Sequence, residues 1–208
     1  MSPPGRPKGE YRRAQPERTP VNGLHRRQAL ALLPALWLMP MAHTHALARA
    51  AAAPVELAGE LPGARLQGSG QMRFVGLRVY DIRLWTARQP AGRTDWSVPL
   101  ALEIEYARAV DGKRIAERSL EEMRRLAPLT PEQAERWLAE MTRLFPDVRE
   151  GDRLTGIKQP DRGVRFFHNG RLTGEVGDPQ FARRFFGIWL APQTSQPQLR
   201  EQLLGPSS

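Results

Sequence analysis

Three polar side chains lie where the sequence pattern predicts buried strand faces. In the segment 71–85, alternation places Arg78 and Tyr80 on one face with the apolar residues Met72, Phe74, Ile82 and Leu84. In the segment 100–106, Tyr106 shares a face with Leu100, Leu102 and Ile104. A cation among apolar side chains is expected to be paired or to reach a cavity. We therefore predict a mostly apolar pocket in which one guanidinium and two hydroxyls bind a carboxylate-bearing or phenolic apolar ligand.

An alternative for Arg78 stays open, because Gly76 lies within the same apolar run. Glycine inside a strand favours a bend or a bulge, which changes the face on which neighbouring side chains lie. Under that alternative Arg78 points to solvent, and the two tyrosines alone supply polar groups to the pocket.

The sequence gives little support for metal or nucleotide chemistry. The chain has no cysteine, and once the first 45 residues are removed His168 is its remaining histidine, so a Cys or multi-His metal site is excluded. The Gly68-Ser69-Gly70 segment lacks the third glycine of a dinucleotide-binding loop and is not followed by a predicted helix. We therefore expect no metal and no other cofactor.

Two groups of carboxylates have the residue types that a hydrolase uses for acid and base chemistry. Glu121 and Glu122 are adjacent in a predicted helix, and Glu103 and Glu105 alternate along a predicted strand. The polar faces on which they fall predict solvated side chains for all four.

The charge of the chain is concentrated at its N-terminus. The net charge is +9, and residues 1–48 contribute +5 of it through seven Arg or Lys and two Asp or Glu. The remaining residues carry 24 basic and 20 acidic side chains, a net of +4. A mixed surface of this kind does not indicate a nucleic-acid partner.

The N-terminal segment has the pattern of an export signal. We expect residues 1–23 to form a disordered basic extension and residues 24–50 to form a signal peptide, with Arg26-Arg27 before the apolar run Ala29–Met41. This run is shorter than the roughly 20 residues needed to span a bilayer, and Pro34 and Pro40 interrupt it; an uncleaved membrane anchor stays open as the alternative. The arginine pair is compatible with the twin-arginine route, and the general secretory route stays open. The prediction is a periplasmic or secreted protein whose mature domain, residues 51–208, has no integral membrane span.

The mature segment predicts a single α+β domain whose order is strands, helices, strands, helices. The pattern favours strands over 71–85, 100–106, 153–157, 164–168 and 171–176, with Asn169-Gly170 as a tight hairpin turn. It favours helices over 113–126, from the capping box at Thr130 onward, from the Asp178-Pro179 cap onward, and over 199–204.

The run from Leu66 to Trp85 resembles the chalcone isomerase-like family, which has a Gly-x-Gly entry to a long strand followed by Val-Tyr and a Leu-aromatic ending. The later order also matches, with a strand 99–106, a helix ending Glu-Glu-Met and a closing Phe-Phe-Gly-Ile-Trp segment. The resemblance covers residues 55–204 and is strongest to the exported bacterial branch. It implies an open-faced β-sandwich in which helices pack on one face of a large antiparallel sheet.

The catalytic pattern of the plant enzymes in that family does not carry over to this chain. Where the resemblance implies an arginine and a threonine, this sequence has Met72 and Val75; where it implies a tyrosine and an asparagine, it has Ile115 and Glu122. Thr173 matches a late hydroxyl of the family. A phenolate needs a cation, and a developing enolate needs hydrogen-bond donors, which methionine, valine and isoleucine cannot supply.

These observations lead to three hypotheses. The first is a non-catalytic protein that binds a small apolar or amphipathic molecule such as a fatty acid, with Arg78, Tyr80, Tyr106 and Thr173 as ligand-binding residues. The second is an intramolecular lyase acting on a chalcone-like or other enone substrate, with Arg73 or Arg78 in place of the missing arginine. The third is an envelope module whose sheet or helix face docks a protein partner, which the sequence does not identify.

Overall fold

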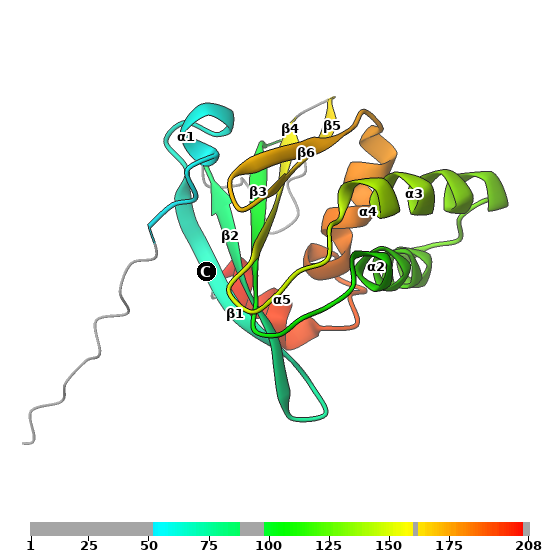
Figure 1. Cartoon of the computed structure of the whole chain (residues 1–208), viewed down its shortest axis with the longest axis horizontal. Coiled ribbons are helices and arrows are strands. Elements are labelled where there is room, and N and C mark those ends of the chain that lie inside the picture. Colours follow the sequence, from blue (N-terminus) through cyan, green and yellow to red (C-terminus); the bar gives the residue numbers. More distant parts are fainter. Residues whose placement is uncertain (1–51, 88–97, 160–161, 206–208) are drawn as a thin grey trace, which may run out of the picture. The chain divides into compact units, whose positions relative to one another are not determined.

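The computed structural model describes residues 52–87, 98–159 and 162–205. The predicted basic extension (1–23) and signal peptide (24–50) lie outside these residues. The described chain forms one antiparallel sheet with most of its helices on one side (Figure 1).

Every strand of this sheet pairs with the strand that follows it in the chain, so the sheet is a meander. All the pairs are antiparallel. The strands are β1 (Arg65–Phe74), β2 (Leu77–Thr86), β3 (Leu100–Tyr106), β4 (Arg153–Gln159), β5 (Gly163–His168) and β6 (Arg171–Val176). The helices are α1 (Leu57–Glu60), α2 (Gly112–Leu126), α3 (Pro131–Leu144), α4 (Pro179–Leu190) and α5 (Pro197–Leu204).

The main core lies between the sheet and the helices α2, α3 and α4. Ile82, Leu102 and Phe166 from the sheet are buried against Met123, Trp137 and Phe186 from the helices. Helix α5 packs beside β1. The short helix α1 lies on the opposite side of the sheet (Figure 1), where Leu57 and Leu61 are buried with Trp85 and Phe167. The prediction of an α+β fold with helices layered on one sheet face is confirmed.

The local signals for helix starts and one hairpin are confirmed. Thr130 and Gln133 form the predicted capping box at α3, and the Asp178 carboxylate accepts hydrogen bonds from two backbone N–H groups at the start of α4. Asn169 and Gly170 form the turn between β5 and β6 with φ of 49° and 83°. These residue types stabilise their conformations locally, so tertiary packing does not override them.

The predicted strand over 71–85 is wrong, because it contains a hairpin turn. β1 ends at Phe74, β2 begins at Leu77, and Val75 and Gly76 form the turn with φ of 48° and 77°. Gly76 indicated a bend or a bulge in this run, but valine is β-branched and rarely adopts a positive φ, so a two-residue turn beginning at Val75 was not predicted.

A second irregularity determines the direction of Arg78. Tyr80 pairs with Met72 and Arg78 pairs with Arg73, so Val79 is an extra residue in β2. Such a bulge interrupts the alternation of faces. Arg78 therefore lies on the same sheet face as Arg73, opposite to that of Tyr80.

In 52–87, 98–159 and 162–205, no helix combines the length and apolar character needed to cross a bilayer. In the same part of the chain, no group of three or more His, Cys, Asp or Glu side chains could hold a metal ion.

Candidate functional site

A cavity of about 770 Å³ lies between the sheet and the helices α2 and α4. Its volume falls within the range of about 300–1,000 Å³ that is typical of small-molecule sites. Strands β1 to β5 form one wall, α2 and α4 form the other, and the segments after β3 and before α5 complete the lining.

The interior of the cavity is apolar and aromatic. Phe166 packs edge-to-face against Phe145 and Phe185, with 5.1 Å between the ring centroids in both pairs. Leu102 and Ile104 from β3 lie on the same lining. Because these side chains are held by mutual packing, the cavity is a preformed apolar volume.

Tyr80 places a hydroxyl in this lining and connects the two layers. Its Oη accepts a hydrogen bond of 2.9 Å from Trp189 Nε1 of α4. Burial raises the pKa of Tyr80 to about 12, partly offset by that hydrogen bond. The phenol therefore stays protonated at physiological pH and retains its own O–H for donation to a ligand.

Tyr106 pairs with Tyr80 across β2 and β3, and the two rings meet edge-to-face at 6.0 Å. Burial raises the pKa of Tyr106 above its ordinary value, with a further contribution from Tyr80. Among the described residues its hydroxyl has no hydrogen-bond partner. A buried hydroxyl that faces a cavity without a partner can bind a polar atom of a ligand.

One face of α2 contributes a polar stripe to the cavity. Ile115, Arg118, Ser119 and Glu122 lie at successive helical positions and all line it. Glu122 is buried, binds Arg118 Nη2 and accepts a hydrogen bond of 2.8 Å from Ser195 Oγ. The expectation that Glu122 is solvated is wrong, because α2 turns this side chain toward the cavity and Arg118 compensates its charge.

Three arginines lie at the edge of the cavity. Arg114 pairs with Asp111 at 3.1 Å and Arg118 pairs with Glu122, while Arg108 follows the end of β3. All three are exposed. In the described part of the chain Arg108 has no ion-pair partner. This edge favours an anionic group above an apolar interior.

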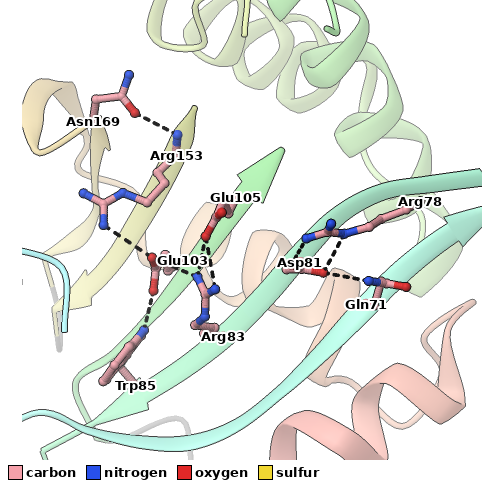
Figure 2. A network of polar contacts seen from close by, with 9 residues as sticks. All are labelled: Gln71, Arg78, Asp81, Arg83, Trp85, Glu103, Glu105, Arg153 and Asn169. Carbon is pink, nitrogen blue, oxygen red and sulfur yellow. Dashed lines mark hydrogen bonds and ion pairs between the residues drawn. The ribbon is translucent and has the colours of Figure 1, made fainter. Parts of the chain in front are cut away.

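Two predicted ligand-binding residues do not line the cavity. Arg78 binds Asp81, which also accepts a hydrogen bond from Gln71, on the outer face of the sheet (Figure 2). Its predicted place among apolar side chains is wrong, because of the extra residue Val79. Thr173 in β6 donates its hydroxyl to the carbonyl oxygen of Phe166 and does not reach the cavity. Tyr80 and Tyr106 are the predicted residues that the fold brings together.

The outer face of the sheet holds a second polar cluster, drawn in Figure 2. Glu103 is 2% exposed and accepts hydrogen bonds from Trp85 Nε1 at 2.9 Å and Arg83 Nη1 at 3.2 Å, with Arg153 at 3.6 Å. Burial raises the pKa of Glu103 against the opposing effect of these partners. The expectation of a solvated Glu103 is wrong, and the cluster is structural because its partners satisfy the carboxylate.

The positions matched to the plant enzymes reach the cavity in part. Met72, Ile115 and Glu122 line it, whereas Val75 lies in the hairpin turn and is 84% exposed. At these two positions methionine and isoleucine supply neither the cation nor the hydrogen-bond donor that the resemblance implies for the enzymes.

Comparison with known proteins agrees with this architecture. A sequence profile described as chalcone isomerase-like matches residues 62–205, which include all six strands of the described sheet. The chain belongs to the chalcone isomerase-like family. Residues outside the profile include the predicted signal peptide.

Two known proteins are similar to this chalcone isomerase-like chain, one in sequence and one in structure. An uncharacterised protein of Haemophilus influenzae is 37% identical over 138 residues, which are 66% of each chain, so the match spans just under two thirds of that relative. The crystal structure of an Arabidopsis thaliana fatty-acid binding protein superposes with a TM-score of 0.56 at 15% identity, covering 68% of this chain and 87% of that one. The second likeness establishes the fold.

Proposed function

We propose that this chalcone isomerase-like protein binds a molecule with an apolar chain and an anionic head, such as a fatty acid, without transforming it. The observation that carries the proposal is the cavity of about 770 Å³ whose interior is aromatic and aliphatic and whose edge carries arginines. The fatty-acid binding of the Arabidopsis neighbour supports the proposal by analogy of fold.

The apolar interior provides the main driving force for binding. Each methylene group removed from water contributes about 0.8 kcal/mol. Rings such as Phe145, Phe166 and Phe185 offer a chain of this kind a dry surface with few polar atoms to desolvate.

The head group has two kinds of partner available. Tyr106 Oη has no partner among the described residues. Tyr80 Oη accepts a hydrogen bond from Trp189, and its own O–H is still available to donate. Both phenols are protonated, so both can donate to a carboxylate. Arg108 adds a positive charge at the cavity edge, and in the described part of the chain it has no ion pair that ligand binding would break.

The lining favours binding over isomerisation. In the family's enzymes a cation and hydrogen-bond donors act on the substrate, and the matched positions here are Met72 and Ile115. Glu122 is the buried carboxylate of the lining, and Arg118 and Ser195 occupy its oxygens. We therefore propose that the protein does not cyclise chalcones; sustained loss of chalcone absorbance at a rate proportional to protein would contradict this.

We also propose that the protein is exported, on the strength of the segment 24–50. The test is a fusion of residues 1–60 to a reporter that is active only outside the cytoplasm, with Arg26→Gln plus Arg27→Gln and a charged substitution in 29–41 as variants. The export proposal requires an active reporter that the charged substitution silences.

The binding proposal is tested by calorimetric titration of the full-length protein with dodecanoate and with dodecanol. The two ligands share the apolar chain and differ in the charge of the head. Arg108→Glu is expected to weaken dodecanoate binding about tenfold and dodecanol binding little, since a hydrogen bond to a charged group contributes about 1.5 kcal/mol. Arg124→Glu, an exposed arginine of α2 outside the cavity lining, is the matched control. Equal effects of the two variants on dodecanoate would contradict the head-group assignment.

A further inference from the structure

The turn between β1 and β2 exposes apolar side chains to an unusual degree. Phe74, Val75 and Leu77 are 69%, 84% and 58% exposed. The pairing of β2 with β3 begins at Tyr80, so the residues before it extend past the neighbouring strand, and Figure 1 shows this hairpin end projecting from the sheet. We call residues 73–78 the hairpin tip. Exposed apolar residues grouped in this way are typical of interaction sites.

The turn of the tip has a residue type that destabilises the folded state. Val75 and Gly76 have φ of 48° and 77°, nearly the values of Asn169 and Gly170 in the other two-residue turn, 49° and 83°. Asparagine and glycine are favoured in that conformation, whereas a β-branched residue is strained in it. Val75 is strained and its apolar side chain is exposed to solvent, so it contributes no apolar burial to the stability of the fold. A binding role accounts for a residue of this type at the tip.

Positive charges flank the apolar residues of the tip. Arg73 and Arg78 lie directly opposite each other on the two strands, a like-charged arrangement that disfavours pairing. Arg78 binds the carboxylate of Asp81. Arg73 Nη1 donates to the carbonyl oxygen of Gly76 and has no carboxylate partner in the described residues. The tip thus combines apolar side chains at its end with guanidinium groups one or two residues behind them.

The tip adjoins the mouth of the cavity. Phe74 and Val79 belong both to the hairpin and to the cavity lining, and Ala107 N donates to the carbonyl oxygen of Val79, which places Arg108 beside the hairpin. Whatever the tip touches therefore lies next to the opening through which an amphipathic molecule would enter.

We propose that the hairpin tip docks on the surface of an anionic phospholipid bilayer. Phe74, Val75 and Leu77 enter the interface, while Arg73, Arg78 and Arg108 contact the phosphate groups. Apolar side chains combined with basic residues are the composition of interfacial anchors. A protein partner is less favoured, because a projecting two-residue turn offers far less surface than the ~800 Å² per partner of a stable protein interface. The proposal goes beyond ligand binding and is measurable without any ligand.

The test uses the absence of cysteine in the chain. Leu77→Cys in the full-length protein carries an environment-sensitive fluorophore at the tip. Leu172→Cys, at an exposed residue of β6, carries the same label as control. Vesicles contain phosphatidylcholine alone or mixed with phosphatidylglycerol. The label at the tip is expected to brighten and shift to shorter wavelength with the anionic vesicles, and the response should weaken as salt is raised. The control label should not change. The control label and the tip variants distinguish docking of the tip from recruitment of the chain through residues 1–51.

Two variants in the Leu77→Cys background test the chemistry of the tip. Val75→Asn removes an apolar side chain and relieves the strained turn, so it should lose most of the response while remaining folded. Arg73→Glu plus Arg78→Glu should lose the preference for phosphatidylglycerol. No response at the tip, an equal response at the control site, or an equal response to neutral vesicles overturns the proposal and favours a protein partner. Dodecanoate titration without vesicles is independent of all these outcomes, so the two proposals can fail separately.

Discussion

Trp189 Nε1 in α4 donates a hydrogen bond of 2.9 Å to Tyr80 Oη in β2, and this contact ties the helix layer to the sheet across the cavity. Tyr106 lies beside Tyr80 with its ring at 6.0 Å, yet in the described residues its hydroxyl has no partner. The two tyrosines thus differ in role: one stabilises the walls of the cavity, and the other offers a free donor to its contents.

Tyr80→Phe is predicted to destabilise the fold, because it leaves the indole N–H of Trp189 without an acceptor. We expect a loss of about 1–2 kcal/mol in the free energy of unfolding. Tyr106→Phe removes a hydroxyl that has no partner in the described part of the chain, so its cost should be close to zero. Chemical denaturation of both variants checks this difference, and equal losses would show that the Trp189 contact does not stabilise the protein.

Glu103→Ala is predicted to be strongly destabilising. Glu103 is 2% exposed, and its removal leaves Arg83 and Trp85 Nε1 without their buried acceptor. Leaving a buried donor such as Trp85 Nε1 without an acceptor costs about 1–3 kcal/mol. Glu105→Ala is the matched control, since this side chain is 36% exposed and also pairs with Arg83. Its loss should cost about 1 kcal/mol or less. Thermal unfolding midpoints that do not separate the two variants would contradict a structural role for the cluster.

Asp178 is predicted to make stability depend on pH below about pH 4. Burial opposes its charge, but hydrogen bonds from Trp137, Phe181 N, Gln180 N and Arg136 outweigh that effect and hold the pKa of Asp178 below its ordinary value. The folded state therefore binds this proton less readily than the unfolded state. The stabilisation is complete above the unfolded-state pKa and is lost as pH falls through the folded-state pKa.

Asp178→Ala checks this prediction by denaturation at several pH values. The variant should lose about 1–2 kcal/mol at neutral pH, and its stability should fall less steeply than that of the native protein in acid. Asp111→Ala is the control, because Asp111 stands at the N-cap of α2 without a capping hydrogen bond. If the free energy of unfolding falls equally steeply in acid for the native protein and for Asp178→Ala, the lowered pKa of Asp178 is contradicted.

Val75→Asn is predicted to stabilise the protein by about 1 kcal/mol, since asparagine tolerates the positive φ of 48° that strains valine. The reciprocal change, Asn169→Val, should be destabilising. It also removes the hydrogen bonds of Asn169 to Arg153 N and Asp152. Differential scanning calorimetry of the two variants should show midpoints moving in opposite directions. A lower midpoint for Val75→Asn would mean that the turn is not strained.

The fold could be predicted from the sequence wherever a local signal agreed with the final packing. The Asn169-Gly170 turn and the caps at Thr130 and Asp178 are of this kind. The turn at Val75 could not be predicted, because its residue type argues against its conformation. A missed turn and the extra residue Val79 together explain the misplaced side chain of Arg78.

The candidate site could be predicted only in part. Tyr80 and Tyr106 follow from strand alternation, and the family resemblance pointed to the positions of Ile115 and Glu122. Arg118 and Ser119 of the same helix face were missed, and Glu122 was expected to be solvated, because only the tertiary arrangement shows that this face borders a cavity. The spacing of Arg118 and Glu122, four residues apart, was the available signal.

Filling the cavity tests the central claim most directly. Met72 is half-buried in the cavity lining, so Met72→Trp should occupy the volume near the mouth with little disturbance of the core. Leu172→Trp places the same side chain at an exposed residue of β6 as control. In calorimetric titrations with dodecanoate, we predict saturable binding by the native protein and by Leu172→Trp, and its loss in Met72→Trp. Undiminished binding by Met72→Trp, or no binding by the native protein, would contradict the claim that this cavity holds an apolar acid.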